Sequence, residues 1–250
     1  TSLSAIPFNR RHWAAEEWAQ TNGSRFIAEV TESTREGIRE AVVAGLQQGT
    51  GPGPLARQLV GTLNASTRKR EGGILGLTGK QASWVMNARR DLENLDPAYF
   101  ERNARDRRHD ATVRKAIKAG KPLAKADIDR IIRRYSDGLL AYRGGIVART
   151  EAHQALNAGR MEAMRQTAEN ADIPLSQIEM KWLATKDLRT RDTHRSMGGQ
   201  TVQFGGTFVS PRGAVMGFPG DTSLGAPASE VVACRCTITF EIKRGDDGNS

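Results

Sequence analysis

Side chains suited to chemistry gather in one short segment, from Trp182 to Gln200, and in a Cys-Arg-Cys motif about thirty residues later. The eight positions from 187 to 194 include Asp187, Arg189, Thr190, Arg191, Asp192 and His194. A loop needs far fewer such groups to stay in solution. Their density therefore predicts a polar constellation that a fold holds in place.

The same residue types include those that bind zinc. Imidazole, thiolate and carboxylate groups are zinc ligands, so Asp187, His194, Cys234 and Cys236 could together close a tetrahedral site. However, Cys-x-Cys is a looser signal than paired Cys-x-x-Cys motifs, and buried cysteines commonly act as small apolar side chains. We therefore expect packing cysteines and no cofactor, and keep a zinc ion on His194, Cys234 and Cys236 as the alternative.

A network of ion pairs and hydrogen bonds is the interpretation we favour for the charged residues. Arginine side chains bind carboxylates with two parallel hydrogen bonds, and such pairs fix one arrangement of the elements that carry them. The expected network joins a long helix to a small sheet. Its members are Arg149, Thr150, Glu151, Asp187, Arg189, Thr190, Arg191, His194 and Arg235.

Catalysis is the competing interpretation of the same residues. His194 with Thr190, Arg189 and Arg191 includes acid-base and oxyanion-stabilising types, as in a nuclease-like toxin module or a zinc-dependent hydrolase. The sequence shows no serine or cysteine with an evident base partner, no glycine-rich phosphate loop and no two-metal spacing of carboxylates. We therefore predict no catalytic residues and a protein that is not an enzyme.

The elements that must position these residues follow from periodicity. Ile178, Met180 and Trp182 alternate with polar residues, which predicts a half-buried strand. A last strand carries Ile238, Phe240 and Ile242 on one face, and by parity both cysteines share that inward face. Glycines divide the chain between these strands into short strands and turns.

Helices are predicted for most of the chain before residue 170. Thr78 and Gln81 form a capping-box spacing, and the helix that they begin should end before Pro97. An amphipathic helix from Ile128 to Tyr142 and an alanine-rich helix over 146–169 follow, interrupted by the glycines at 144 and 145. The fold class is therefore α+β, a mainly helical N-terminal region followed by a small Gly-rich mixed or antiparallel β module packed on a long helix. The expected parts are an N-terminal arm (1–30), a basic helical region (31–125), a helical hairpin (126–170), a module (171–244, with helix 146–170) and a loose tail (245–250).

Positive charge is concentrated in one helical segment. The chain carries 37 Lys and Arg against 28 Asp and Glu, and residues 101–125 hold nine basic residues against three acidic ones. Few aromatic side chains accompany them, which favours contact with phosphates without reading of bases. The alternatives are an acidic protein partner and a solvated helix face. The candidate nucleic-acid-binding residues are Arg102, Arg105, Arg107, Arg108, Arg114, Lys115 and Lys118.

The compartment is indicated by what the sequence lacks. No window reaches the roughly 18 uncharged apolar residues of a membrane span, and the N-terminus has no secretory layout. The two cysteines would have Cα atoms about 6.6 Å apart in a strand, poorly aimed for a mutual disulfide, which agrees with a reducing compartment. We expect a soluble protein with no membrane contact, made in cytoplasm. Residue 1 is Thr, so we expect a processed form or a fragment of a longer protein.

Three blocks of this sequence, over about 140 to 242, resemble the phage Mu protein F-like family of minor head or head-morphogenesis proteins of tailed bacteriophages. An upstream segment, 76–82, is similar to the helical region that often precedes this domain. Two features depart from the family pattern: the glycine pair at 144 and 145, and Ala233, where Asn is common. The blocks are Ile146 to Ala155, Lys181 to His194 with the Gly-Gly-Gln after it, and Phe218 to Asp221 leading into the Cys-Arg-Cys motif.

This resemblance implies a structural role in the virion. It implies association with the portal protein and with capsid or scaffolding proteins, and a place in the capsid interior near the portal vertex, after assembly in the host cytoplasm. Non-specific contact with packaged DNA would use the basic helices, while the C-terminal module docks on a protein surface. A protein that only compacts DNA is a third possibility, and it predicts binding by residues 66–135 alone.

Overall fold

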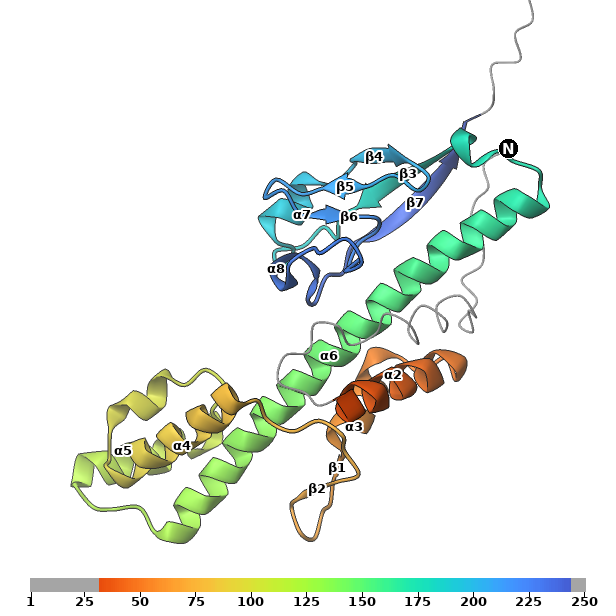
Figure 1. The fold of residues 1–250 in the computed structure, drawn as a ribbon. Coiled ribbons are helices and arrows are strands. Elements are labelled where there is room, and N and C mark those ends of the chain that lie inside the picture. Colours follow the sequence, from red (N-terminus) through yellow and green to blue (C-terminus); the bar gives the residue numbers. More distant parts are fainter. Residues whose placement is uncertain (1–31, 244–250) are drawn as a thin grey trace, which may run out of the picture. The chain divides into compact units, whose positions relative to one another are not determined.

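The computed structural model describes residues 32–243, and within them the chain is an α+β protein, as predicted (Figure 1). It folds as two compact units. The first contains Glu32–Leu55 and residues 146–243, and the second contains Ala56–Gly145. The expected arm over 1–30 and tail over 245–250 lie outside the described residues. None of the described helices has an apolar stretch long enough to cross a bilayer.

The second unit is a small helical domain. Its elements are β1 (Thr62–Leu63), β2 (Arg70–Glu71), α4 (Gly79–Glu93), η1 (Pro97–Glu101), η2 (Arg107–His109), α5 (Asp110–Ala119) and the first part of α6 (Lys125–Asn170). The predicted capping box is confirmed, because Thr78 accepts a hydrogen bond from the Gln81 amide and Gln81 accepts one in return. The core contains Leu92, Tyr99 and Ile131.

The predicted break at Gly144 and Gly145 is wrong, because residues 125–170 form one helix, α6. A methyl group on Gly144 would lie 2.3 Å from Val60 Cγ1 and 3.2 Å from the Ala56 carbonyl oxygen, both on α3 (Pro52–Val60). Glycine here permits close approach of two helices. Its propensity cost of about 1 kcal/mol is too small to end a packed helix.

The first unit contains the sheet. Strand β3 (Ile178–Leu183) pairs antiparallel with β7 (Thr237–Ile242) on one side and with β4 (Thr201–Gln203) on the other. A separate antiparallel pair joins β5 (Phe208–Val209) to β6 (Val215–Met216). Short helices α7 (Asp192–Ser196) and α8 (Ala228–Val231) and the turn η3 (Leu175–Gln177) complete the module, and α2 (Glu32–Gln47) belongs to the same unit.

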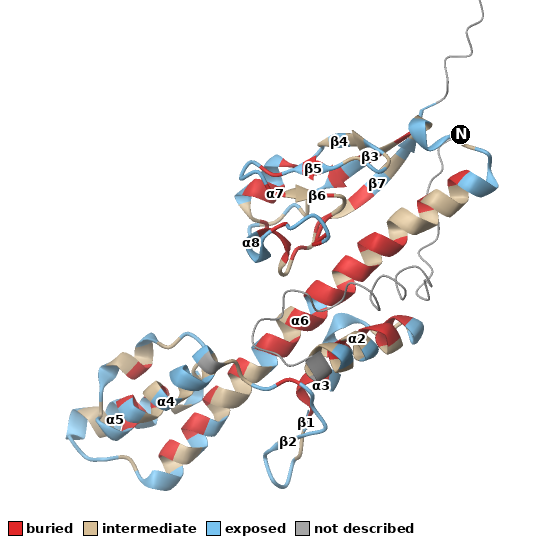
Figure 2. Ribbon diagram, viewed as in Figure 1, coloured by how far each residue is buried: buried red, intermediate tan, exposed pale blue. Residues whose placement is uncertain are grey.

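The predicted strand alternation is confirmed. Ile178, Met180 and Trp182 are buried on β3, with exposed or half-buried residues between them (Figure 2). These side chains face the core of the module, and Met164 and Ala168 of α6 pack on Ile178. Ile38, Val42 and Leu46 of α2 recur at every fourth position and are buried. The sheet is thereby packed on the long helix.

Candidate functional site

The two predicted stretches meet through an ion pair. Asp187, in the turn after β3, accepts hydrogen bonds from both terminal nitrogens of Arg235, at 2.5 and 2.6 Å. The Arg235 guanidinium holds the pKa of the Asp187 carboxyl well below its usual range. Thr185 Oγ1 donates to the Arg235 carbonyl at 2.7 Å, and Thr190 Oγ1 donates to the Thr185 carbonyl at 2.6 Å. The turn after β3 is therefore tied to the start of β7.

Arg191 makes a second connection between these stretches. Its two terminal nitrogens donate to the main-chain carbonyls of Glu230 at 2.7 Å and Val232 at 2.5 Å, where α8 ends. Two other arginines of the predicted network behave differently: the Arg189 side chain is 82% exposed, 3.8 Å from Asp187, and Arg149 is exposed. The arginine contacts of the network therefore come chiefly from Arg191 and Arg235.

One face of α6 binds the main chain around the cysteines. Thr150 Oγ1 accepts a hydrogen bond from the Ala233 amide at 2.9 Å, and Glu151 beside it is buried. His153 Nε2 lies 2.6 Å from the Cys236 carbonyl, to which it donates. Burial lowers the pKa of His153, which favours the neutral ring with its proton on Nε2. These contacts join the predicted helix to the predicted motif.

Two further residues on this face were not predicted. Asn157 is buried, and its Nδ2 donates to the carbonyls of Pro219 at 2.9 Å and Cys236 at 3.1 Å. Arg160 donates to Thr237 Oγ1 at 2.5 Å. The spacing of 150, 153, 157 and 160 is that of one helix face, so a polar stripe on an alanine-rich helix was the available signal.

A buried cluster contains the two cysteines that flank Arg235 in the sequence. His194 is 1% exposed, and its Nδ1 lies 3.4 Å from Cys234 Sγ and 3.5 Å from Cys236 Sγ. The three possible ligand atoms all lie within 4.8 Å of one another. The ring meets Trp182 edge to face at 5.2 Å between centroids. Glu230, which the sequence analysis did not single out, is 0% exposed, and its Oε2 lies 3.1 Å from His194 Nε2.

The two cysteines are unlike in acidity. Their mutual hydrogen bond and burial raise the pKa of Cys234, while the hydrogen bonds from Cys234 and His194 lower the pKa of Cys236. Both thiols are buried and free. The fourth ligand that the sequence suggested, Asp187, pairs with Arg235 instead. This cluster can hold a metal ion on two sulfur atoms and one nitrogen.

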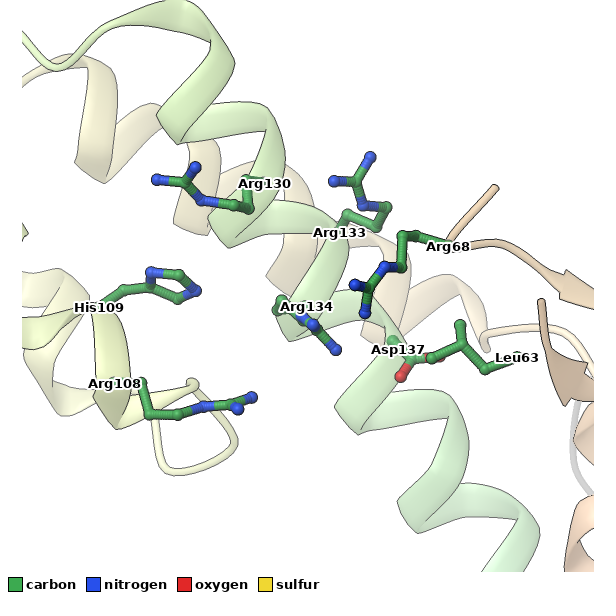
Figure 3. Close-up of a pocket in the computed structure, with 8 residues that line it drawn as sticks. All are labelled: Leu63, Arg68, Arg108, His109, Arg130, Arg133, Arg134 and Asp137. Carbon is green, nitrogen blue, oxygen red and sulfur yellow. The ribbon is translucent and has the colours of Figure 1, made fainter. Parts of the chain in front are cut away.

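A basic cavity lies in the helical unit (Figure 3). Its volume is about 310 Å³. Within the described residues, Arg68, Arg133 and Arg134 have no ion-pair partner, whereas Arg130 pairs with Asp127. The one acidic residue of the lining pairs with Arg70 at 2.6 Å. The lining residues are Leu63, Arg68, Arg108, His109, Arg130, Arg133, Arg134 and Asp137.

The predicted nucleic-acid-binding residues divide into two groups. Arg102 and Arg105 are largely covered and form ion pairs with Asp91 at 2.5 Å and Asp110 at 3.0 Å, so they hold the helical unit together. The others are exposed, and among them Arg108 lines the cavity. They are Arg107, Arg108, Arg114, Lys115 and Lys118.

The chain matches the model of a known protein family and is similar to a known protein. The model of the family described as phage Mu protein F like protein matches residues 109–239, which are 131 of the 250 residues. The minor head protein GP7 of Bacillus phage SPP1 is 32% identical over 97 residues, 39% of this chain and 29% of that protein. The chain thus matches less than a third of that relative's length. No solved structure matches.

Proposed function

The chain belongs to the phage Mu protein F-like family, and we propose that it is a bacteriophage minor head protein with a structural role in head morphogenesis. The observation that carries the proposal is the position of the match. It runs from the start of α5 into β7 and so includes the α6 face and both sides of the polar network. The name of the similar SPP1 protein supports the same role.

A structural role suits the chemistry of the module. The polar side chains bind main-chain carbonyls and one another, and such contacts hold elements in a single arrangement. The nuclease-like alternative has less support, since His194 is 1% exposed and beyond the reach of a polynucleotide. We therefore propose a rigid module that presents a fixed surface to other head proteins, with the portal as the first candidate.

Packaged DNA is the second proposed partner, and the basic cavity supports it. Several guanidinium groups converge there with no described acidic partner, which is the charge arrangement that binds phosphates. Figure 3 shows Arg130, Arg133 and Arg134 on α6, with Arg108 and His109 opposite them on η2. The contact would be with the backbone of DNA and independent of its sequence.

A salt series tests the contact with DNA. Binding of a random-sequence duplex should weaken with salt, by about 0.9 in the slope of log affinity against log salt for each phosphate contacted. Arg133→Gln should lower that slope by about 1 for every duplex tested. The matched control is Arg165→Gln, because Arg165 is already paired with Glu162 and Glu169. Affinity that does not change with salt would remove DNA from the proposal.

Cross-linking of assembled heads tests the protein partner. Mass spectrometry of cross-linked procapsids should recover links between the module and the portal protein. Links only to the major capsid protein would show a shell position instead. Either result leaves the DNA question to the salt series.

A further inference from the structure

The buried cluster has the dimensions of a metal site. A tetrahedral zinc ion has Zn–S bonds of about 2.3 Å and Zn–N bonds of about 2.05 Å, so a sulfur and a nitrogen on one ion lie about 3.6 Å apart. The His194 Nδ1 atom lies 3.4 Å from Cys234 Sγ and 3.5 Å from Cys236 Sγ. Both distances agree with this tetrahedral edge within about 0.2 Å.

The arrangement of these three atoms also favours a metal ion over hydrogen bonds alone. An unprotonated imidazole nitrogen has one lone pair and accepts one good hydrogen bond. Here two thiol sulfur atoms, Cys234 Sγ and Cys236 Sγ, lie at nearly equal distances from one nitrogen of His194. A metal ion satisfies all three atoms at once, because each of them can donate an electron pair to it.

The far side of the imidazole carries the partner that metal-bound histidines usually have. Glu230 Oε2 lies 3.1 Å from His194 Nε2, and the Thr193 hydroxyl donates to the same oxygen at 2.9 Å. A carboxylate in this position keeps the proton on Nε2 and directs Nδ1 toward a metal. The N–H is not aligned on Oε2, and Glu230 Oε1 is buried with no partner among the described residues.

A bound cation would also balance the charge in this core. Burying a carboxylate is costly unless an opposite charge compensates it, and Glu230 is 0% exposed. With zinc present, two thiolates and this carboxylate are balanced by the ion and by the Arg191 guanidinium, which donates to the carbonyls of Glu230 and Val232. Without an ion, the described partners of the Glu230 carboxylate are the Thr193 hydroxyl at 2.9 Å and the His194 ring at 3.1 Å.

We propose that His194, Cys234 and Cys236 bind one zinc ion, with Glu230 orienting the histidine and a water molecule in the fourth position. Two thiolates and an imidazole form a soft ligand set that selects zinc over magnesium or calcium. The ion would join α7 to the segment between α8 and β7. The zinc proposal does not depend on DNA binding or on contact with the portal protein.

Metal analysis of the full chain is the first test. Protein purified in reducing buffer without chelators should contain about one zinc ion per chain, and chelation should lower its melting temperature. X-ray absorption should show sulfur at about 2.3 Å and nitrogen or oxygen at about 2.0–2.1 Å, with two sulfur atoms per zinc. This readout uses the unmodified protein, so a variant that fails to fold does not affect it.

Two variants separate ligands from packing. The double variant Cys234→Ser with Cys236→Ser should lose the zinc, and Glu230→Gln should weaken zinc binding by about 10- to 100-fold. Val231→Ala is the matched control, because Val231 is buried in the same core and offers no ligand atom; it should retain zinc. Zinc below about one-tenth per chain after addition of zinc salt, or zinc retained by the double serine variant, would overturn the assignment.

Discussion

The two neighbouring glycines of α6 should respond oppositely to the same substitution. At Gly144 an added methyl group would lie 2.3 Å from Val60 Cγ1, whereas at Gly145 nothing lies within 4 Å of it. Carbon atoms in contact normally lie about 3.5–4.0 Å apart, so Gly144→Ala requires a shift of more than about 1 Å. Gly145→Ala requires none.

The magnitudes follow from packing and helix propensity. Overpacking costs about 1–3 kcal/mol, and replacing a mid-helix glycine by alanine contributes about 1 kcal/mol in the other direction. Gly144→Ala should therefore lower the free energy of unfolding by up to about 2 kcal/mol. Gly145→Ala should raise it by about 0.5–1 kcal/mol, through helix propensity alone.

Urea denaturation monitored by circular dichroism measures both changes in the free energy of unfolding. In thermal melts, each kcal/mol should shift the melting temperature by about 2–4 °C. Val60→Ala removes the Cγ1 atom that the new methyl group would meet. In a double-mutant cycle, Val60→Ala should therefore lower the free energy of unfolding by about 1 kcal/mol less in the Gly144→Ala background than in the wild type. Equal stabilities of the two alanine variants would refute the close packing of α3 on α6.

Three further changes test the network and the cores. Asp187→Asn should destabilise the protein at neutral pH, because the Asp187 carboxylate stabilises the fold through its pair with Arg235 only while it is charged. Pairing lowers the pKa of Asp187, so the difference in stability between wild type and variant should narrow as pH falls below about 4. Thermal melts at several pH values measure this difference. Tyr99→Phe should leave stability at pH 7 unchanged or raise it by up to about 1 kcal/mol, because the buried hydroxyl has no described partner. Since burial raises the pKa of Tyr99 to about 12, the wild type should lose stability relative to this variant as pH rises above about 10, in alkaline melts. Ala233 has a φ of 54°, so Ala233→Asn should stabilise by about 0.5–1 kcal/mol in urea, provided that the amide still donates to Thr150.

Local rules predicted the regular elements well. The capping box at Thr78, the alternation from Ile178 to Trp182 and the paired last strand depend on short-range chemistry, and each is present in the structure. The proximity of the Asp187 turn to the Cys-Arg-Cys motif follows from the same pattern. Once two strands of this kind pair, their ends must lie together.

Long-range contacts explain what the sequence did not reveal. The glycine pair at 144 and 145 predicted a helix break because glycine has low helix propensity. The actual reason for glycine at 144 is its contact with Val60, which is distant in the chain and becomes visible only in the packed structure. Asn157 and Glu230 are ordinary polar residues until the fold buries them against main chain and imidazole. Spacing along a helix was an available signal for the first of these, and no sequence signal marked the second.

Charge was the least reliable guide to binding residues. A run of basic residues includes both arginines that stabilise a fold and arginines that face a ligand, and composition does not separate them. Arg102 and Arg105 proved to be of the first kind. Arg68, Arg133 and Arg134, which line the cavity, lie outside the run that the sequence analysis selected.

The protein composition of purified particles is the measurement that bears most directly on the proposed role. Quantitative mass spectrometry of procapsids and full heads from the encoding phage should find this chain in both, at a fixed ratio to the portal protein. Its absence from both particles, while the free protein is present in infected cells, would contradict the account.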